Sequence, residues 1–209
     1  LAAVFVGVVS LYDAETGGAR ALLVGAVLFT VAALTDALDG WLARRWRAIS
    51  VFGRVMDPFA DKLLVLGAFI VLAGPGFQTA GGGQLSGVLP WMAVVVLGRE
   101  LLVTTIRGVY ESAGVDFSAG WAGKAKMIVQ SAAAPTILLV AWAAGGTAER
   151  RGVTGLGLGL LDRDAAMTVN TVLAWVVVLV TAWSAWPYVS RAVRASGELT
   201  TSRRAEGGA

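Results

Sequence analysis

The sequence contains no cysteine and no histidine among its 209 residues. Disulfides, thiol catalysis, haem ligation and the usual zinc sites are therefore excluded, and any bound metal ion must be held by oxygen ligands. Charge is also scarce, because 15% of the residues are charged whereas 56% are hydrophobic. The mean hydropathy is +0.72. A chain this apolar is expected in a lipid bilayer rather than as a soluble domain.

Long apolar runs bounded by glycine, proline or charge predict membrane-spanning helices. A helix needs about 20 apolar residues to cross the hydrocarbon core. Runs of this kind occupy residues 1–12, 20–43, 52–73, 88–110, 122–144 and 168–189, and the first begins without a charged leader. We therefore expect an all-α integral membrane protein, a bundle of six transmembrane helices with the first helix truncated at its N-terminus. Residues 1–190 are expected to form the membrane domain and residues 191–209 a cytoplasmic tail.

The distribution of basic residues predicts the orientation of the chain. The connection RRWRAIS at residues 44–50 carries three arginines, whereas GPGFQTAGGGQLSG at residues 74–87 carries no lysine or arginine. Because basic residues gather in cytoplasmic loops, the first of these connections should face the cytoplasm in a multi-pass protein of the cell membrane. Residues 149–164, with three arginines on the opposite side, are the one departure. The net charge of +3 is thus explained by orientation, and we expect no nucleic-acid partner.

Four aspartates lie in the second and third runs, on either side of the basic connection. Asp36 and Asp39 are three residues apart and Asp57 and Asp61 are four apart, so each pair shares one face of a helix. The short connection makes the two helices antiparallel neighbours. The four carboxylates are therefore expected to converge just inside the cytoplasmic surface.

Converging carboxylates in a membrane need a compensating positive charge, because each costs about 2.5–3.5 kcal/mol at the centre of a span and somewhat less near the interface. Oxygen ligands suit Mg²⁺ or Mn²⁺, and four carboxylates suit two ions that together stabilise a phosphoryl displacement. Two other interpretations remain open. The aspartates could be interfacial charges paired with Arg44, Arg54 and Lys62, or they could serve an ion or proton transporter, although a transporter would more often spread them along its pathway.

Small residues accompany the aspartates. Gly40 and Ala43 follow Asp39 at one-turn spacing, and Gly53 lies four residues before Asp57. Their helices present surfaces without bulky side chains, where either a ligand or a neighbouring backbone can approach closely. Helix packing explains these residues as well as ligand binding does.

The aspartates and small residues form one string of eight positions: Asp36, Asp39, Gly40, Ala43, Arg44, Gly53, Asp57 and Asp61. At every position this string resembles the signature of the CDP-alcohol phosphatidyltransferase family. The resemblance implies a six-helix membrane fold, usually a homodimer, in which a CDP-linked lipid enters from the bilayer and an alcohol displaces CMP.

The resemblance also implies roles for individual residues. Asp36, Asp39 and Asp57 would be metal ligands, and Asp61 would be both a ligand and the general base. The CDP-lipid contacts would come from Gly40, Ala43, Arg44, Ser50 and Gly53.

Three further segments resemble the bacterial glycerol 3-phosphate branch of that family. They are VMDPFADKLLVLGAFIVL, GRELLVTTIRG and GKAKMIVQ, at residues 55–72, 98–108 and 123–130. This resemblance implies transfer of a phosphatidyl group from CDP-diacylglycerol to the 1-hydroxyl of glycerol 3-phosphate, with two Mg²⁺ or Mn²⁺ ions. Inositol phosphate, or phosphatidylglycerol as in a cardiolipin synthase, remains open as the acceptor.

Four basic residues are candidates to bind the phosphate of the acceptor. Arg99 and Arg107 are eight residues apart on one helix face, and Lys124 and Lys126 open the fifth run. An arginine within a span usually faces the bundle interior, and its guanidinium can hold a phosphate by two charge-assisted hydrogen bonds. The alternative is that these residues only anchor the chain at the cytoplasmic interface, which is favoured for Lys126.

Overall fold

The computed structural model is an all-helical bundle, and it describes residues 1–15, 18–46, 51–112, 120–144 and 161–206. Within these ranges it does not describe the side chains of residues 40, 41, 43, 44, 46, 51–61, 111 and 194–206. The elements are α1 (Ala2–Val9), α2 (Ala19–Trp46), α3 (Val51–Leu72), the short 3₁₀ helix η1 (Pro75–Phe77), α4 (Pro90–Ser112), α5 (Trp121–Ala144) and α7 (Arg163–Glu206). The described ranges contain no β-strand, only an isolated bridge between Gln78 and Gln84.

The helices begin and end close to the predicted apolar runs. α2, α3, α4 and α5 match the runs to within three residues at either end. α4 starts at Pro90, a residue that suits the first helical turn because its missing N–H would have no partner there. The helical assignment of all six runs is confirmed.

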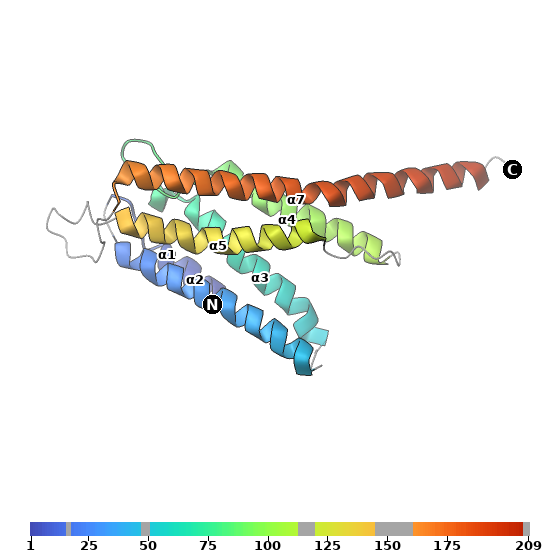
Figure 1. The fold of residues 1–209 in the computed structure, drawn as a ribbon, viewed down its shortest axis with the longest axis horizontal. Helices are drawn as coiled ribbons and strands as arrows, with labels where there is room; N and C mark the ends of the chain where they lie inside the picture. The colour runs from blue at the N-terminus through green and yellow to red at the C-terminus, as the bar shows by residue number, and fades with distance from the viewer. Residues whose placement is uncertain (16–17, 47–50, 113–119, 145–160, 207–209) are drawn as a thin grey trace.

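The last helix is much longer than the run that predicted it. α7 has 44 residues, about 66 Å at the rise of an α-helix, and it continues to Glu206. The expected tail at 191–209 is therefore helical as far as Glu206. Hydropathy falls after Ser190, but residues 188–206 contain no proline and one glycine, so nothing stops the intrahelical hydrogen bonds from propagating. Figure 1 shows this helix extending well beyond the rest of the bundle.

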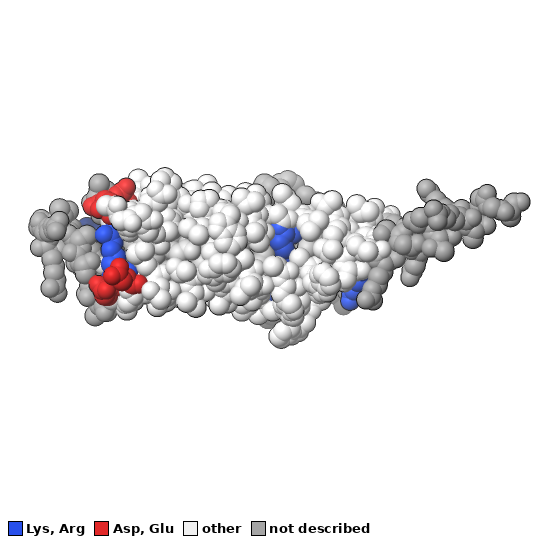
Figure 2. Space-filling model, turned by 90° about the horizontal axis from the view of Figure 1, so that it is seen from above, with Lys and Arg blue, Asp and Glu red and all other residues white. Residues whose placement is uncertain are grey.

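In the described part of the chain, three helical segments are long and apolar enough to cross a membrane: Ala19–Asp39, Trp121–Ala144 and Arg163–Val193. α4 is a continuous helix, but it contains the charged residues Arg99, Glu100 and Arg107, which lower its mean hydropathy. The fold therefore fits a membrane protein, while the count of six crossings and the truncation of the first helix stay predictions. Figure 2 shows a long, mostly uncharged surface, with acidic and basic side chains gathered at one end and further basic side chains near the middle and toward the other end.

Connections of the bundle meet at one end, here called the loop end. There the turn after α1 and the segment around η1 join, because the Ala14 amide donates to the Gly76 carbonyl at 2.8 Å. Arg163, at the start of α7, donates to the Ala14 carbonyl and lies 3.6 Å from Glu15 Oε1. The opposite end, where α2 ends and α3 begins, is called the aspartate end (Figure 1).

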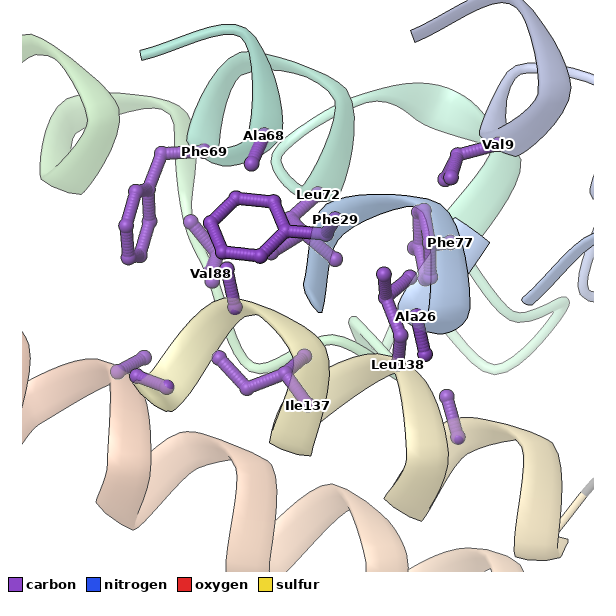
Figure 3. Packing of buried hydrophobic residues seen from close by; sticks show 14 of the residues in the cluster. Val9, Ala26, Phe29, Ala68, Phe69, Leu72, Phe77, Val88, Ile137 and Leu138 are labelled. Carbon is purple, nitrogen blue, oxygen red and sulfur yellow. The ribbon is translucent and has the colours of Figure 1, made fainter. Parts of the chain in front are cut away.

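The apolar core occupies the half of the bundle nearest the loop end. Phe29 of α2 lies at its centre, with Leu72 of α3 and Ile137 of α5 nearby (Figure 3). The Phe5 ring of α1 packs edge-on against Phe29, with ring centroids 5.5 Å apart. α5 contacts both α2 and α7, and α1 contacts both α2 and α3. This core holds the helices together at one end and leaves the other end to the polar residues.

Candidate functional site

The two aspartate pairs lie on two consecutive helices, as the sequence predicted. Asp36 and Asp39 belong to α2, and Asp57 and Asp61 belong to α3. Both helices are continuous through these positions, so the spacings of three and four residues place each pair on one helical face. α2 and α3 contact one another, and residues 47–50 connect them.

The part of α2 that carries its aspartates is exposed. Leu34 and Leu38 are 59% and 63% exposed, and every residue from 34 to 39 is exposed. The described side chains therefore leave Asp36 and Asp39 accessible, in contrast to the buried Phe29 two turns earlier. A ligand can reach these carboxylates without displacing core residues.

Several predicted site residues have side chains outside the described part of the chain. They are Gly40, Ala43, Arg44, Gly53, Asp57 and Asp61, whose helical backbones are described, and Ser50, which lies wholly outside. Among the described side chains no three acidic residues come together as a metal site. Because two of the four aspartates are not in that set, the convergence of all four carboxylates stays a prediction.

A hydrogen bond joins α3 and α4 near the aspartates of α3. Lys62 Nζ donates to Thr104 Oγ1 at 2.6 Å. Lys62 follows Asp61 directly, and the two helices run in opposite directions (Figure 1). Arg107 lies one turn beyond Thr104 along α4, toward the aspartate end.

A buried ion cluster lies deeper in the bundle, between α4 and α5. Arg99, Glu100 and Lys126 are 9%, 7% and 8% exposed. Glu100 Oε1 accepts a hydrogen bond from Arg99 Nη1 at 3.2 Å and another from Lys126 Nζ. Two cations thus share one carboxylate, which leaves the cluster with a formal charge of +1. Lys126 does not reach the surface, as membrane anchoring would require.

Polar side chains of α7 and α5 complete this cluster. Arg99 Nε donates to Ser184 Oγ at 3.1 Å, and Ser184 Oγ donates to the Thr181 carbonyl at 2.8 Å. Gln130 Nε2 donates to Thr181 Oγ1 at 2.9 Å, and Gln130 lies one turn after Lys126 on α5. Hydrogen bonds thus link six buried residues across three helices in a chain whose two ends are one turn apart on α5. We call this set the buried polar ring: Arg99, Glu100, Lys126, Gln130, Thr181 and Ser184.

The four predicted phosphate-binding residues are not equivalent in the structure. Arg99 and Lys126 belong to the buried polar ring, Arg107 is partly buried nearer the aspartate end, and Lys124 is exposed near the start of α5. The sequence interpretation assigned no role to Gln130, Thr181 or Ser184. The sequence did contain a signal for these three residues, because polar residues inside apolar spans usually face the bundle interior and pair there.

Comparison with known protein families gives one match over most of the chain. The family model for CDP-alcohol phosphatidyltransferase matches residues 1–183. That range includes all four aspartates and all four candidate phosphate-binding residues.

Named relatives point to the same family. A Bacillus subtilis protein named CDP-diacylglycerol--glycerol-3-phosphate 3-phosphatidyltransferase is 38% identical over 117 residues, 56% of this chain and 55% of the relative. A Mycoplasma genitalium protein of the same name is 37% identical over 52% of this chain and 42% of its own length. A Mycobacterium tuberculosis protein named probable phosphatidylglycerophosphate synthase is 32% identical over 86% of this chain and 70% of its own length. The chain spans about half the length of the first two relatives.

Proposed function

Because this chain belongs to the CDP-alcohol phosphatidyltransferase family, we propose that it transfers the phosphatidyl group of CDP-diacylglycerol to glycerol 3-phosphate. The products are CMP and phosphatidylglycerophosphate, an intermediate of phospholipid biosynthesis. The observation that carries the choice of acceptor is the position of Arg107 on α4. Thr104 of α4 accepts a hydrogen bond from Lys62, the residue after Asp61, and Arg107 lies one turn beyond Thr104 toward the aspartate end, which supports its assignment as the cation for a phosphate-bearing acceptor.

The aspartates are proposed to hold two divalent ions, Mg²⁺ or Mn²⁺. Members of the family generally depend on a divalent metal. The donor set fits, because carboxylate oxygens are the ligands that hard cations prefer, and the side chains of Asp36 and Asp39 are accessible. Asp57 and Asp61 would supply the remaining carboxylates from α3. When bound, such ions neutralise negative charge on the reacting phosphate groups.

Asp61 is proposed as the general base. The 1-hydroxyl of glycerol 3-phosphate attacks the phosphorus that bears the lipid, and its proton passes to the Asp61 carboxylate. A new oxygen–phosphorus bond forms while the bond to CMP breaks, and CMP leaves with the electron pair. Asp61 acts only if the acceptor hydroxyl comes within hydrogen-bond reach, so the acceptor must be bound in a fixed position.

The donor lipid is proposed to bind along α2 and the start of α3. Gly40, Ala43 and Gly53 would allow the CDP group to approach the helices closely, since they carry little or no side chain. Arg44 would pair with a phosphate of the donor, and Ser50 would add a hydroxyl contact.

The acceptor phosphate is proposed to bind to cations of α4 and α5. Arg107 and Lys124 lie nearer the aspartate end, and Arg99 and Lys126 form the deeper boundary of the site. An arginine can bind a phosphate through two hydrogen bonds. This arrangement fixes the orientation of the acceptor and strengthens its binding. We further propose that the protein is a homodimer in the cell membrane, with the aspartate end facing the cytoplasm.

The proposed function is tested by measuring CMP release from CDP-diacylglycerol in detergent with Mg²⁺. Glycerol 3-phosphate, inositol phosphate, phosphatidylglycerol and no acceptor are compared in separate reactions. We expect CMP release with glycerol 3-phosphate alone. Release with another acceptor would reassign the substrate within the family, and no release with any acceptor would leave a transporter as the better interpretation of the aspartates.

A further inference from the structure

α7 supplies two side chains to the buried polar ring, although the family signature lies wholly in α2, α3 and the residues that connect them. Ser184 is the first residue beyond the family match, which ends at residue 183. It is fully buried, and it contacts an arginine 85 positions earlier in the chain. The family match therefore does not include this serine.

The Ser184 hydroxyl is fixed by the two hydrogen bonds that it makes. Its oxygen accepts from Arg99 Nε at 3.1 Å, and its proton is donated to the Thr181 carbonyl at 2.8 Å. A hydroxyl has one proton to donate, so this pairing determines which way its acceptor lone pairs point. Those lone pairs are directed at Arg99.

The Arg99 guanidinium is consequently held at all three nitrogens. Nε donates to Ser184 Oγ, Nη2 donates to the Ser184 carbonyl at 3.4 Å, and Nη1 donates to Glu100 at 3.2 Å. The Tyr188 ring lies beneath the group, with its centroid 5.8 Å from Cζ. Because the guanidinium is planar, these contacts fix its plane as well as its position.

The hydrogen bonds that Arg99 makes within the described residues do not use all of its N–H donors. A guanidinium has five N–H donors, and the three hydrogen bonds use one on each nitrogen. One N–H on Nη1 and one on Nη2 remain. Two N–H groups of this kind are what an arginine uses to bind a phosphate bidentately.

We infer that Ser184 is a positioning residue for the acceptor phosphate and that it acts through Arg99. This inference rests on the proposed function, since it takes glycerol 3-phosphate as the acceptor. Ser184 holds the guanidinium in one orientation before the acceptor arrives, so little orientational freedom is lost on binding.

The test compares Ser184→Ala with Ser190→Ala, the same substitution two turns later on α7. Ser190 bonds only to the Pro187 carbonyl of its own helix in the described structure, so it is a matched control. We expect Ser184→Ala to raise the KM for glycerol 3-phosphate roughly tenfold, the order expected for one hydrogen bond to a charged group. The KM for CDP-diacylglycerol should stay within about twofold, and Ser190→Ala should change neither value.

A double-mutant comparison separates positioning from a general effect on the fold. In an Arg99→Ala background, Ser184→Ala should not raise the KM for glycerol 3-phosphate further, because the group through which it acts is gone. The inference is overturned if the KM for glycerol 3-phosphate is unchanged, if both KM values rise equally, or if the two substitutions are additive. If Ser184→Ala does not fold, Ser184→Cys replaces it, since a thiol of similar shape is a weak acceptor.

Failure of the inference and failure of the proposed function give different results. Normal turnover in the wild type with no effect of Ser184→Ala overturns the inference alone. Absence of turnover in the wild type overturns the proposed function. Equilibrium binding of glycerol 3-phosphate is measured in parallel, and affinity that is absent or independent of Ser184 overturns the inference even in an inactive protein.

Discussion

Lys126 on α5 donates a hydrogen bond to the same carboxylate oxygen of Glu100 on α4 that accepts from Arg99. All three side chains are buried, so each charge depends on its neighbours rather than on water for stabilisation. Because two cations share one carboxylate, substitutions at different members of the cluster should lower the stability of the protein by different amounts.

Glu100→Gln should destabilise the protein more than Lys126→Met. Glu100→Gln leaves two buried cations without their shared anion, and breaking a buried pair costs about 3–5 kcal/mol. Lys126→Met leaves Glu100 still paired with Arg99, so the loss should be smaller. Thermal unfolding in detergent measures both, with Asp164→Asn, at the exposed start of α7, as a control expected to cost less than about 1 kcal/mol. Equal losses for the two variants would contradict the shared-carboxylate interpretation.

Asp61→Asn should abolish most of the catalysis while the protein still binds its donor. The amide keeps the size and one oxygen but cannot accept the proton of the acceptor hydroxyl. A general base contributes typically 10²- to 10⁴-fold, so kcat should fall at least about a hundredfold. Purified Asp61→Asn is assayed for CMP release after CDP-diacylglycerol binding in Mg²⁺ has been verified, alongside Asp164→Asn. Retention of more than about a tenth of wild-type turnover would show that Asp61 is not the base.

Removal of divalent ions should abolish activity reversibly. Converging carboxylates repel one another unless cations lie between them, and oxygen-only ligands favour Mg²⁺ or Mn²⁺. CMP release is followed after treatment with EDTA and again after either ion is restored in excess. Full activity in excess chelator would be evidence against metal binding by Asp36, Asp39, Asp57 and Asp61.

Arg107→Ala should raise the KM for glycerol 3-phosphate far more than that for CDP-diacylglycerol. The phosphate that Arg107 is proposed to hold belongs to the acceptor alone, and charge-assisted hydrogen bonds of this kind are each worth roughly tenfold or more. Arg20→Ala is the matched control, because Arg20 is an exposed arginine at the start of α2, far from the aspartate end. If both substrates are affected equally, Arg107 serves the fold instead.

Gly87→Ala should be severely destabilising, whereas Gly82→Ala should be mild. Both glycines have positive φ, 66° and 77°, a conformation that costs a residue with a Cβ about 1–2 kcal/mol. A Cβ on Gly87 would also lie 2.3 Å from the Thr171 backbone nitrogen in α7, whereas one on Gly82 would meet nothing within 4 Å. Comparing the unfolding midpoints of the two variants isolates the steric part. Similar midpoints would show that the segment between α3 and α4 does not pack against α7 as closely as described.

Local features of the chain were predictable because helix geometry is local. The apolar runs marked α2, α3, α4 and α5 to within three residues, and the spacing of Asp36 and Asp39 placed them on one face without reference to any other element. The end of α7 was not predictable from hydropathy. The chain leaves the apolar region near Ser190, but backbone hydrogen bonding continues to Glu206, since a change of polarity does not by itself end a helix.

The sequence by itself determined that the chain is apolar, helical and free of histidine and cysteine, and that its carboxylates come in pairs on two consecutive helices. Only the tertiary structure decided which polar residues meet. The sequence predicted Arg99 facing the bundle interior and favoured Lys126 at the interface, and packing of α4 against α5 and α7 buries both residues around Glu100 and Ser184. The pairs Glu100–Lys126 and Arg99–Ser184 join residues 26 and 85 positions apart. Their contacts depend on the rotation of each helix about its axis, which is set by how the apolar core packs and not by the local sequence.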